Sequence, residues 1–153
     1  MSGALAARWL TAALALALPA GAEPFLEISV EGSVLRTLPL PEDQEICLTW
    51  AHSVTGGKVA DCFENRAGQL VLTRSYLHDF AAGLGEVEGR GKLTSAPGGG
   101  YWIEDMDEPL PDNRLHLRVG APQVGHRLTG REVDIPLSEL APGARAILTL
   151  SAE

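Results

Sequence analysis

The stretch CLTWAHSVTGGKVADC, residues 47–62, carries the pattern from which the fold can be worked out. Apolar and β-branched residues lie on both sides of a glycine-containing turn, which is typical of an antiparallel hairpin. A turn centred on Val54 and Thr55 places Cys47 directly opposite Cys62, where β-carbons come within disulfide range. The sequence therefore predicts a disulfide that fixes the register of the hairpin, with two buried free thiols as the alternative.

The same alternation of apolar and polar residues continues on both sides of this hairpin, for example at Leu26, Ile28 and Val30. No window shows sustained helical spacing, and Gly- and Pro-containing turns punctuate the chain. These features predict an all-β fold, an antiparallel β-sandwich or flattened barrel of about ten short strands. The predicted strands cover residues 25–30, 34–38, 45–51, 58–64, 69–77, 90–95, 101–105, 114–119, 126–135 with a break near Gly130, and 144–151. Residues 137–140 are predicted to form one helical turn.

The N-terminus carries the features of a removable export signal. One basic residue precedes an apolar run over residues 9–18, and a proline and the triplet Ala20-Gly21-Ala22 follow. The run is about half as long as a membrane-spanning helix requires, and the small residues suit a signal peptidase. We therefore expect a signal peptide over residues 1–22, cleaved between Ala22 and Glu23, and a single β-sandwich domain over residues 23–153. The mature protein is then periplasmic and does not span the membrane; an uncleaved anchor is the alternative.

The chain is acidic, with 20 Asp and Glu against 12 Lys and Arg and a net charge of −8. Loss of the predicted signal peptide removes one basic residue and makes the charge more negative. Phosphate backbones repel such a domain, so we do not expect a nucleic acid partner. Export would also supply the oxidising environment in which a disulfide persists.

The sequence contains no motif that indicates catalysis, a cofactor or a metal site. His52 and Ser53 come nearest to a hydrolase pair, with Asp61 or Asp79 to orient the histidine. Adjacent strand residues point to opposite faces, however, and no Gly-x-Ser-x-Gly elbow occurs. The four histidines lack the spacing of metal ligands. We therefore expect no catalytic residues, no cofactor and no metal.

Two groups of charged residues each allow two interpretations. The acidic residues within 104–108 indicate a solvated turn, with calcium binding as the alternative. Arg114, Arg118 and Arg127 either form a carboxylate-binding fork or, because Arg114 and Arg118 share one strand face, only balance the acidic turn.

Two segments are the preferred contact surfaces for a partner or ligand. At the hairpin tip, glycines leave room for close approach, and Trp50 and His52 share one strand face. The other explanation places Trp50 in the core and leaves His52 and Ser53 to satisfy the turn backbone. Residues 79–91 form either a partner-binding loop or only a long mobile loop. The candidate contact residues are Trp50, His52, Ser53, Thr55, Gly56, Gly57, Phe80, Gly83, Leu84 and Gly85.

Four elements in a fixed order carry a resemblance to a known family. They are Cys47-Leu-Thr-Trp50-Ala-His52-Ser53-Val54-Thr55-Gly56 running to Asp61-Cys62-Phe63, then Phe80-Ala-Ala82-Gly83-Leu84-Gly85, Gly100-Tyr101-Trp102-Ile103 and Leu115-His-Leu117-Arg118-Val119-Gly120. Together they resemble the exported bacterial family catalogued as domain of unknown function eighteen-fifty, over essentially the whole mature domain.

The resemblance implies a role in solute uptake, because members of that family look like small exported domains often encoded beside TAXI-type TRAP transporters. Those transporters import carboxylate-containing solutes with the help of a solute-binding protein. The resemblance implies a non-enzymatic accessory or adaptor module whose partner is the permease or the solute-binding protein, and it supplies no catalytic residues. The alternatives are an independent periplasmic carrier of small carboxylates and, less expected, a small hydrolase. A carrier predicts one deep apolar pocket, whereas an adaptor predicts a flat exposed patch around residues 52–57 and 80–85.

Overall fold

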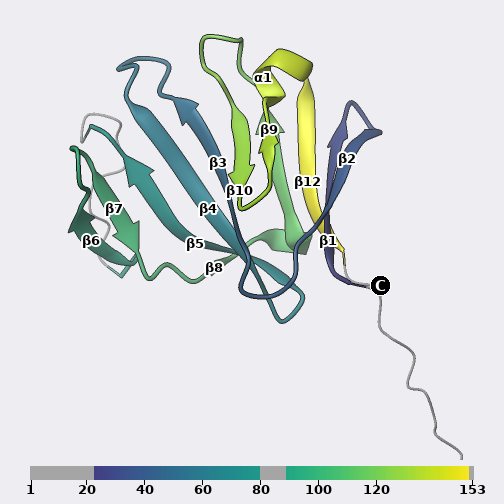
Figure 1. Cartoon of the computed structure of the whole chain (residues 1–153), viewed down its shortest axis with the longest axis horizontal. Helices are drawn as coiled ribbons and strands as arrows, with labels where there is room; N and C mark the ends of the chain where they lie inside the picture. Colours follow the sequence, from purple (N-terminus) through teal and green to yellow (C-terminus); the bar gives the residue numbers. More distant parts are fainter. Residues whose placement is uncertain (1–22, 80–88, 152–153) are drawn as a thin grey trace, which may run out of the picture.

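The computed structural model describes residues 23–79 and 89–151, which form two antiparallel sheets (Figure 1). The four-stranded sheet contains, in order, β2 (Ser33–Pro39), β1 (Phe25–Val30), β12 (Arg145–Ser151) and β9 (Arg114–Arg118). The eight-stranded sheet contains, in order, β11 (Asp134–Ile135), β10 (Arg127–Gly130), β3 (Glu45–Ala51), β4 (Lys58–Arg66), β5 (Gln69–Leu77), β7 (Tyr101–Glu104) and β6 (Lys92–Ser95), and β8 (Glu108–Pro109) pairs with β5. The predicted all-β antiparallel architecture is confirmed, and the two sheets do not close into a barrel.

Each predicted strand has an observed counterpart whose ends differ by at most two residues, and the strands over 25–30, 45–51 and 69–77 have the predicted bounds. The expected break near Gly130 separates β10 from β11, and the predicted helical turn is α1 (Leu137–Leu140). Sequence analysis missed β8 and the 3₁₀ helix η2 (Pro111–Asn113), which are too short to show a period. Among the described residues, no helix is long and apolar enough to cross a membrane. The predicted signal peptide, residues 1–22, lies outside the described residues.

The hairpin of β3 and β4 has the predicted register. Cys47 pairs with Cys62 and Trp50 pairs with Val59, and the two cysteine sulfurs are bonded to each other. The disulfide is therefore present and the alternative of free thiols is not. At the tip, the Gly56 N–H donates to the His52 carbonyl (2.8 Å), so residues 53–55 form the loop.

The core lies between the inward faces of the two sheets, where alternate strand residues are buried. The buried side chains of three central strands are Leu26 and Ile28 of β1, Ile46 and Leu48 of β3, and Ala146, Leu148 and Leu150 of β12. Because strand side chains alternate between faces, the residues between them point outward. The outward face of the eight-stranded sheet, opposite this core, holds the candidate site.

Candidate functional site

The outward face of the eight-stranded sheet is hollowed by a groove of about 750 Å³, here called the open groove. Strands β3, β4, β5, β7 and β10 form its floor, and the segments around Pro97 and Val124 border it. Its lining is Cys47, Thr49, Trp50, Ala51, Lys58, Val59, Ala60, Tyr76, Ala96, Pro97, Trp102, Gln123, Val124, Gly125, Arg127 and Thr129. The register explains this set, because Thr49 pairs with both Ala60 and Arg127, and Tyr76 pairs with Trp102.

Two outward aromatic rings form one wall of the open groove. The ring centroids of Tyr76 and Trp102 are 5.2 Å apart, with the planes tilted by 55°. The Arg74 guanidinium lies 4.4 Å from the centre of the Trp102 ring, a cation–π contact. The Tyr76 hydroxyl donates to the Gly99 carbonyl (3.0 Å), which ties the turn after β6 to β5. This wall is therefore held in place by contacts within the chain.

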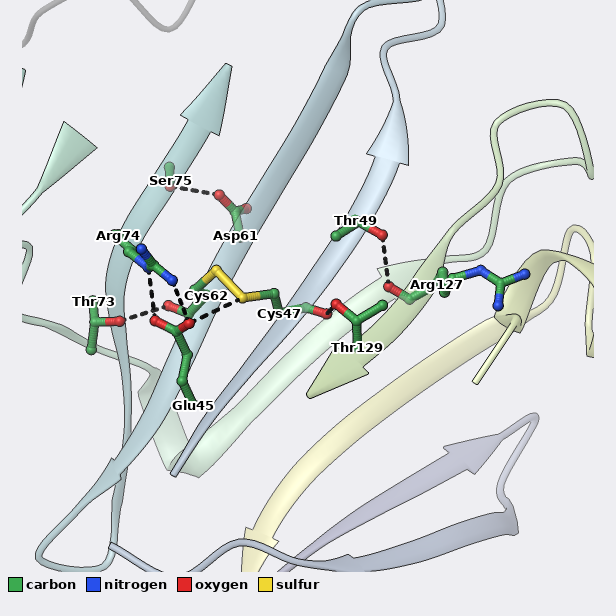
Figure 2. The surroundings of a disulfide bond; sticks show 10 residues. All are labelled: Glu45, Cys47, Thr49, Asp61, Cys62, Thr73, Arg74, Ser75, Arg127 and Thr129. Atoms are coloured by element: carbon green, nitrogen blue, oxygen red, sulfur yellow. Dashed lines mark hydrogen bonds and ion pairs between the residues drawn. A yellow bond between two sulfur atoms is a disulfide. The ribbon is translucent and has the colours of Figure 1, made fainter. Parts of the chain in front are cut away.

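The disulfide stiffens the floor of the groove, and a polar cluster surrounds it (Figure 2). Arg74 donates two hydrogen bonds to the Glu45 carboxylate (2.8 and 2.6 Å), and this pairing raises the pKa of the Arg74 guanidinium, so that it stays charged. Thr49 and Thr129 each donate to a main-chain carbonyl across the β3–β10 pair. Glu45 also lies close to both cysteine sulfurs. Sulfurs bonded to each other are not thiolates, so this group does not offer the ligands that zinc takes.

The hairpin tip is held together by its own side chains. The His52 imidazole Nδ1 accepts from the main-chain N–H groups of Val54 and Thr55, each at 3.3 Å. The Thr55 hydroxyl accepts from the Gly57 N–H (3.2 Å). His52 therefore satisfies the turn backbone, as one of its two interpretations predicts, and its place in a contact surface stays a prediction. The Ser53 and Thr55 side chains are exposed.

The remaining predicted contact residues lie in different surroundings. Trp50 is half-buried against the core and packs against the His126 ring, with 5.8 Å between centroids, although it also borders the open groove. A β-carbon at Gly57 would lie 2.5 Å from the Asp79 carboxylate, so this glycine makes room for the protein's own chain. A β-carbon at Gly56 would have no atom within 4 Å beyond those of its chain neighbours, so this glycine leaves open space at the tip. The predicted contacts Phe80, Gly83, Leu84 and Gly85 lie outside the described residues.

The sequence analysis did not select Tyr76, Trp102 or Lys58, which line the groove. The sequence contained one sign that Trp102 faces outward, because it alternates with Tyr101 and Ile103 along the strand. Both of these neighbours are buried in the structure. A large aromatic residue on the outward face of such a strand marks a candidate contact surface. The segments around Pro97 and Val124 gave no comparable signal, because only the folded sheet brings them to the same groove.

Neither Asp61, the candidate orienting acid, nor the buried His126 belongs to a catalytic arrangement in residues 23–79 and 89–151. Asp61 accepts a hydrogen bond from Ser75 (2.6 Å), and burial raises the pKa of its carboxyl, partly opposed by that bond. His126 accepts at Nδ1 from the Gly120 N–H (2.7 Å), and burial lowers the pKa of its imidazole. In these described segments, no serine or threonine hydroxyl bonds to a histidine ring. Within them, the geometry shows no nucleophile activated by a base.

Of the two interpretations of Arg114, Arg118 and Arg127, the carboxylate-binding fork does not form. Arg114 and Arg118 lie on β9 of the four-stranded sheet, whereas Arg127 lies on β10 of the other sheet and pairs with Asp134 and Glu139. The acidic turn is balanced elsewhere, because Asp107 pairs with Arg66 and Glu108 with Arg90. 

One comparison with known proteins found a relationship. A family model described as "Domain of unknown function (DUF1850)" matches residues 46–137, more than half of the chain. The match runs from β3 to the first residue of α1 and so includes most of the groove-lining strands and the hairpin tip. Searches of curated proteins and of solved structures found no significant match.

Proposed function

The chain belongs to the DUF1850 family of domains of unknown function, and from that premise we propose that it is a non-enzymatic, exported accessory module of a TAXI-type TRAP solute uptake system. In this proposal a cleaved signal peptide delivers one domain to the periplasm. There the domain docks onto a protruding loop of the transporter permease or of its solute-binding protein. The open groove and the hairpin tip together receive that loop.

The observation that carries the proposal is the continuity of these two surfaces. A second hollow of about 480 Å³ surrounds the tip and is lined by residues 51–56, Gln123 and Val124. Ala51, Gln123 and Val124 also line the open groove. A partner surface resting on the tip would therefore also reach the wall formed by Tyr76 and Trp102.

The composition of the groove suits a protein partner. Aromatic residues are enriched where protein interfaces concentrate their binding energy, and Tyr76 and Trp102 are both half-buried on an outward face. The floor is a hydrogen-bonded sheet crossed by a disulfide, so little conformational entropy is lost there on binding. A shallow hollow across five strands resembles a docking surface more than a cavity that encloses a small molecule.

The alternative function is an independent carrier of small carboxylates, and one observation favours it. Lys58 borders the same groove, is exposed and forms no ion pair within the described residues. A carboxylate bound beside Trp102 would have this ammonium available. Titration with a four-carbon dicarboxylate, followed by tryptophan fluorescence, tests this alternative; a saturable change that Lys58→Gln abolishes would support it.

Site-specific photo-crosslinking in intact cells tests the accessory function. A photoreactive amino acid is placed at Val54 or Lys58, which line the tip hollow and the groove, and in the matched control at Val34 of β2. Val54 and Val34 are both exposed valines, at 86% and 60% of the residue's full exposure, but Val54 lies in the loop between β3 and β4 and Val34 lies on the four-stranded sheet. We expect a transporter subunit to be crosslinked from positions 54 and 58 and not from 34. Equal crosslinking from all three positions, or none to any transporter subunit, would refute the proposal.

A further inference from the structure

The outward face of the four-stranded sheet carries a row of basic side chains. Arg114, His116 and Arg118 alternate with half-buried leucines along β9, and all three are exposed. The pairing of β9 with β12 places Arg118 directly opposite Arg145, which is also exposed. Three arginines and one histidine therefore share one face of two neighbouring strands, and we call this group the cationic row.

The arginines of the cationic row form no ion pair within the described residues. The ion pairs within the described residues involve Arg66, Arg74, Arg90 and Arg127 and no arginine of the row. The Glu31 carboxylate, which lies nearby, accepts from the main-chain N–H of Arg145. Like charges directly opposite each other on a sheet are destabilising. In a chain with 20 acidic and 12 basic residues, this face thus keeps three arginines without an ion pair among the described residues, and Glu27 of β1 lies on the same face beyond Thr149.

The geometry of the row matches an extended acidic chain. Residues two apart on a strand are separated by about 6.7 Å, so Arg114, His116 and Arg118 repeat at the interval of alternate residues in any other strand. β9 is the last strand of its sheet, and one of its edges has no neighbouring strand among the described residues. A segment lying beside that edge with acidic residues at alternate positions would place its carboxylates next to these side chains.

We propose that the cationic row binds an extended acidic protein segment that lies along β9. Arg114 and Arg118 contact carboxylates at alternate positions of that segment, and Arg145 adds charge behind Arg118. This surface lies on the sheet that the accessory docking surface does not use. Either proposal can therefore fail without the other.

Peptide binding to the purified protein tests the proposal. One peptide of about seven residues alternates threonine with glutamate, and the other has the same composition with the glutamates consecutive. The double variant Arg114→Gln, Arg118→Gln removes two charges of the row. Arg131→Gln is the matched control, since Arg131 is exposed on the turn between β10 and β11 and forms no ion pair in the described structure.

We expect the alternating peptide to bind at low salt, and the double variant to weaken this binding roughly 5- to 10-fold. The consecutive peptide should bind at least about fivefold more weakly, and Arg131→Gln should change affinity by less than about twofold. Amide chemical shifts should change along β9 in the same titration. The melting temperature of the double variant should not fall, because the substituted side chains are exposed and the Arg118–Arg145 opposition is relieved.

Several results would overturn the proposal. The first is absence of peptide binding. The second is equal binding of the two peptides or equal weakening by Arg131→Gln, because either would mean general electrostatic attraction. Binding only to vesicles containing anionic phospholipid would assign the row to a membrane surface. Self-association that the double variant abolishes would assign it to a second copy of this chain.

Discussion

Removal of the disulfide should lower stability without changing the fold. The double variant Cys47→Ala, Cys62→Ala opens a loop that spans 15 positions of sequence. Alanine is the suitable replacement because Cys62 is fully buried and a serine hydroxyl there would need a partner. The β3–β4 pairing continues on both sides of the bond, so the strands should stay paired without it.

The size of the effect follows from the length of the closed loop. A disulfide that closes about 15 residues stabilises a protein by about 3 kcal/mol in the chain-entropy estimate. The unfolded hairpin retains some local structure, which reduces this gain, so we expect a loss of about 2–3 kcal/mol. For a domain of about 130 residues this corresponds to a fall in melting temperature of about 7–11 °C.

Thermal and urea unfolding, followed by far-UV circular dichroism, measure this loss. The control is the wild-type protein unfolded with and without a reducing agent, because reduction opens the loop but keeps both sulfur atoms in the protein. We expect the reduced wild type and the alanine variant to lose similar stability. If the alanine variant melts within about 2 °C of the oxidised wild type, the loop-closure reasoning is wrong.

Three further changes test other parts of the structure. Burial raises the pKa of Asp61 above 3.8. The stability that its neutral carboxyl contributes is therefore fully present below pH 3.8 and is lost as the pH rises through the folded-state pKa. Asp61→Asn should therefore raise the melting temperature at pH 7 and lose this advantage near pH 4; an effect independent of pH would contradict the assignment. Burial lowers the pKa of His126 below 6.5, so the stability that its neutral form contributes is present above pH 6.5 and lost as pH falls through the folded-state value. His126→Asn should make the free energy of unfolding less dependent on pH over that range. An unchanged dependence on pH would exclude His126 as its source. Asn65, 1% exposed, donates to the Leu40 carbonyl and accepts from the Gly68 N–H. Asn65→Ala should cost about 2–4 kcal/mol in urea unfolding, and a cost under about 1 kcal/mol would mean that water replaces both bonds.

The candidate site was only partly predictable, and Trp50 and Trp102 show why. Both tryptophans belong to strands that the sequence predicted, and both lie in segments whose residues alternate between the two faces of a strand. Trp50 was assigned to the contact surface because it shares a strand face with His52, and in the structure it packs against the core and also borders the open groove. Trp102 was part of the family resemblance but was not selected, although its face lines the open groove. Deciding between them requires knowing which face each strand presents to the other sheet.

The arginines of β9 were also only partly predictable from the sequence. Their alternation predicted that Arg114 and Arg118 share a face, and both are exposed on β9. Their neighbour is Arg145, which is distant in sequence, and not Arg127. Strand order determines such neighbours, and strand order depends on long-range packing that local patterns do not encode.

The sequence by itself determined the all-β class, the positions of the strands, the register of the β3–β4 hairpin and the disulfide that joins it. These features are local, because alternation, turn residues and opposed positions are set by residues close in the chain. Only the tertiary structure decided which strands are neighbours, which faces meet in the core, and hence where the open groove and the cationic row lie. The physical reason is that burial of apolar faces is shared by the whole domain, so the surfaces left outside are known only once both sheets are packed.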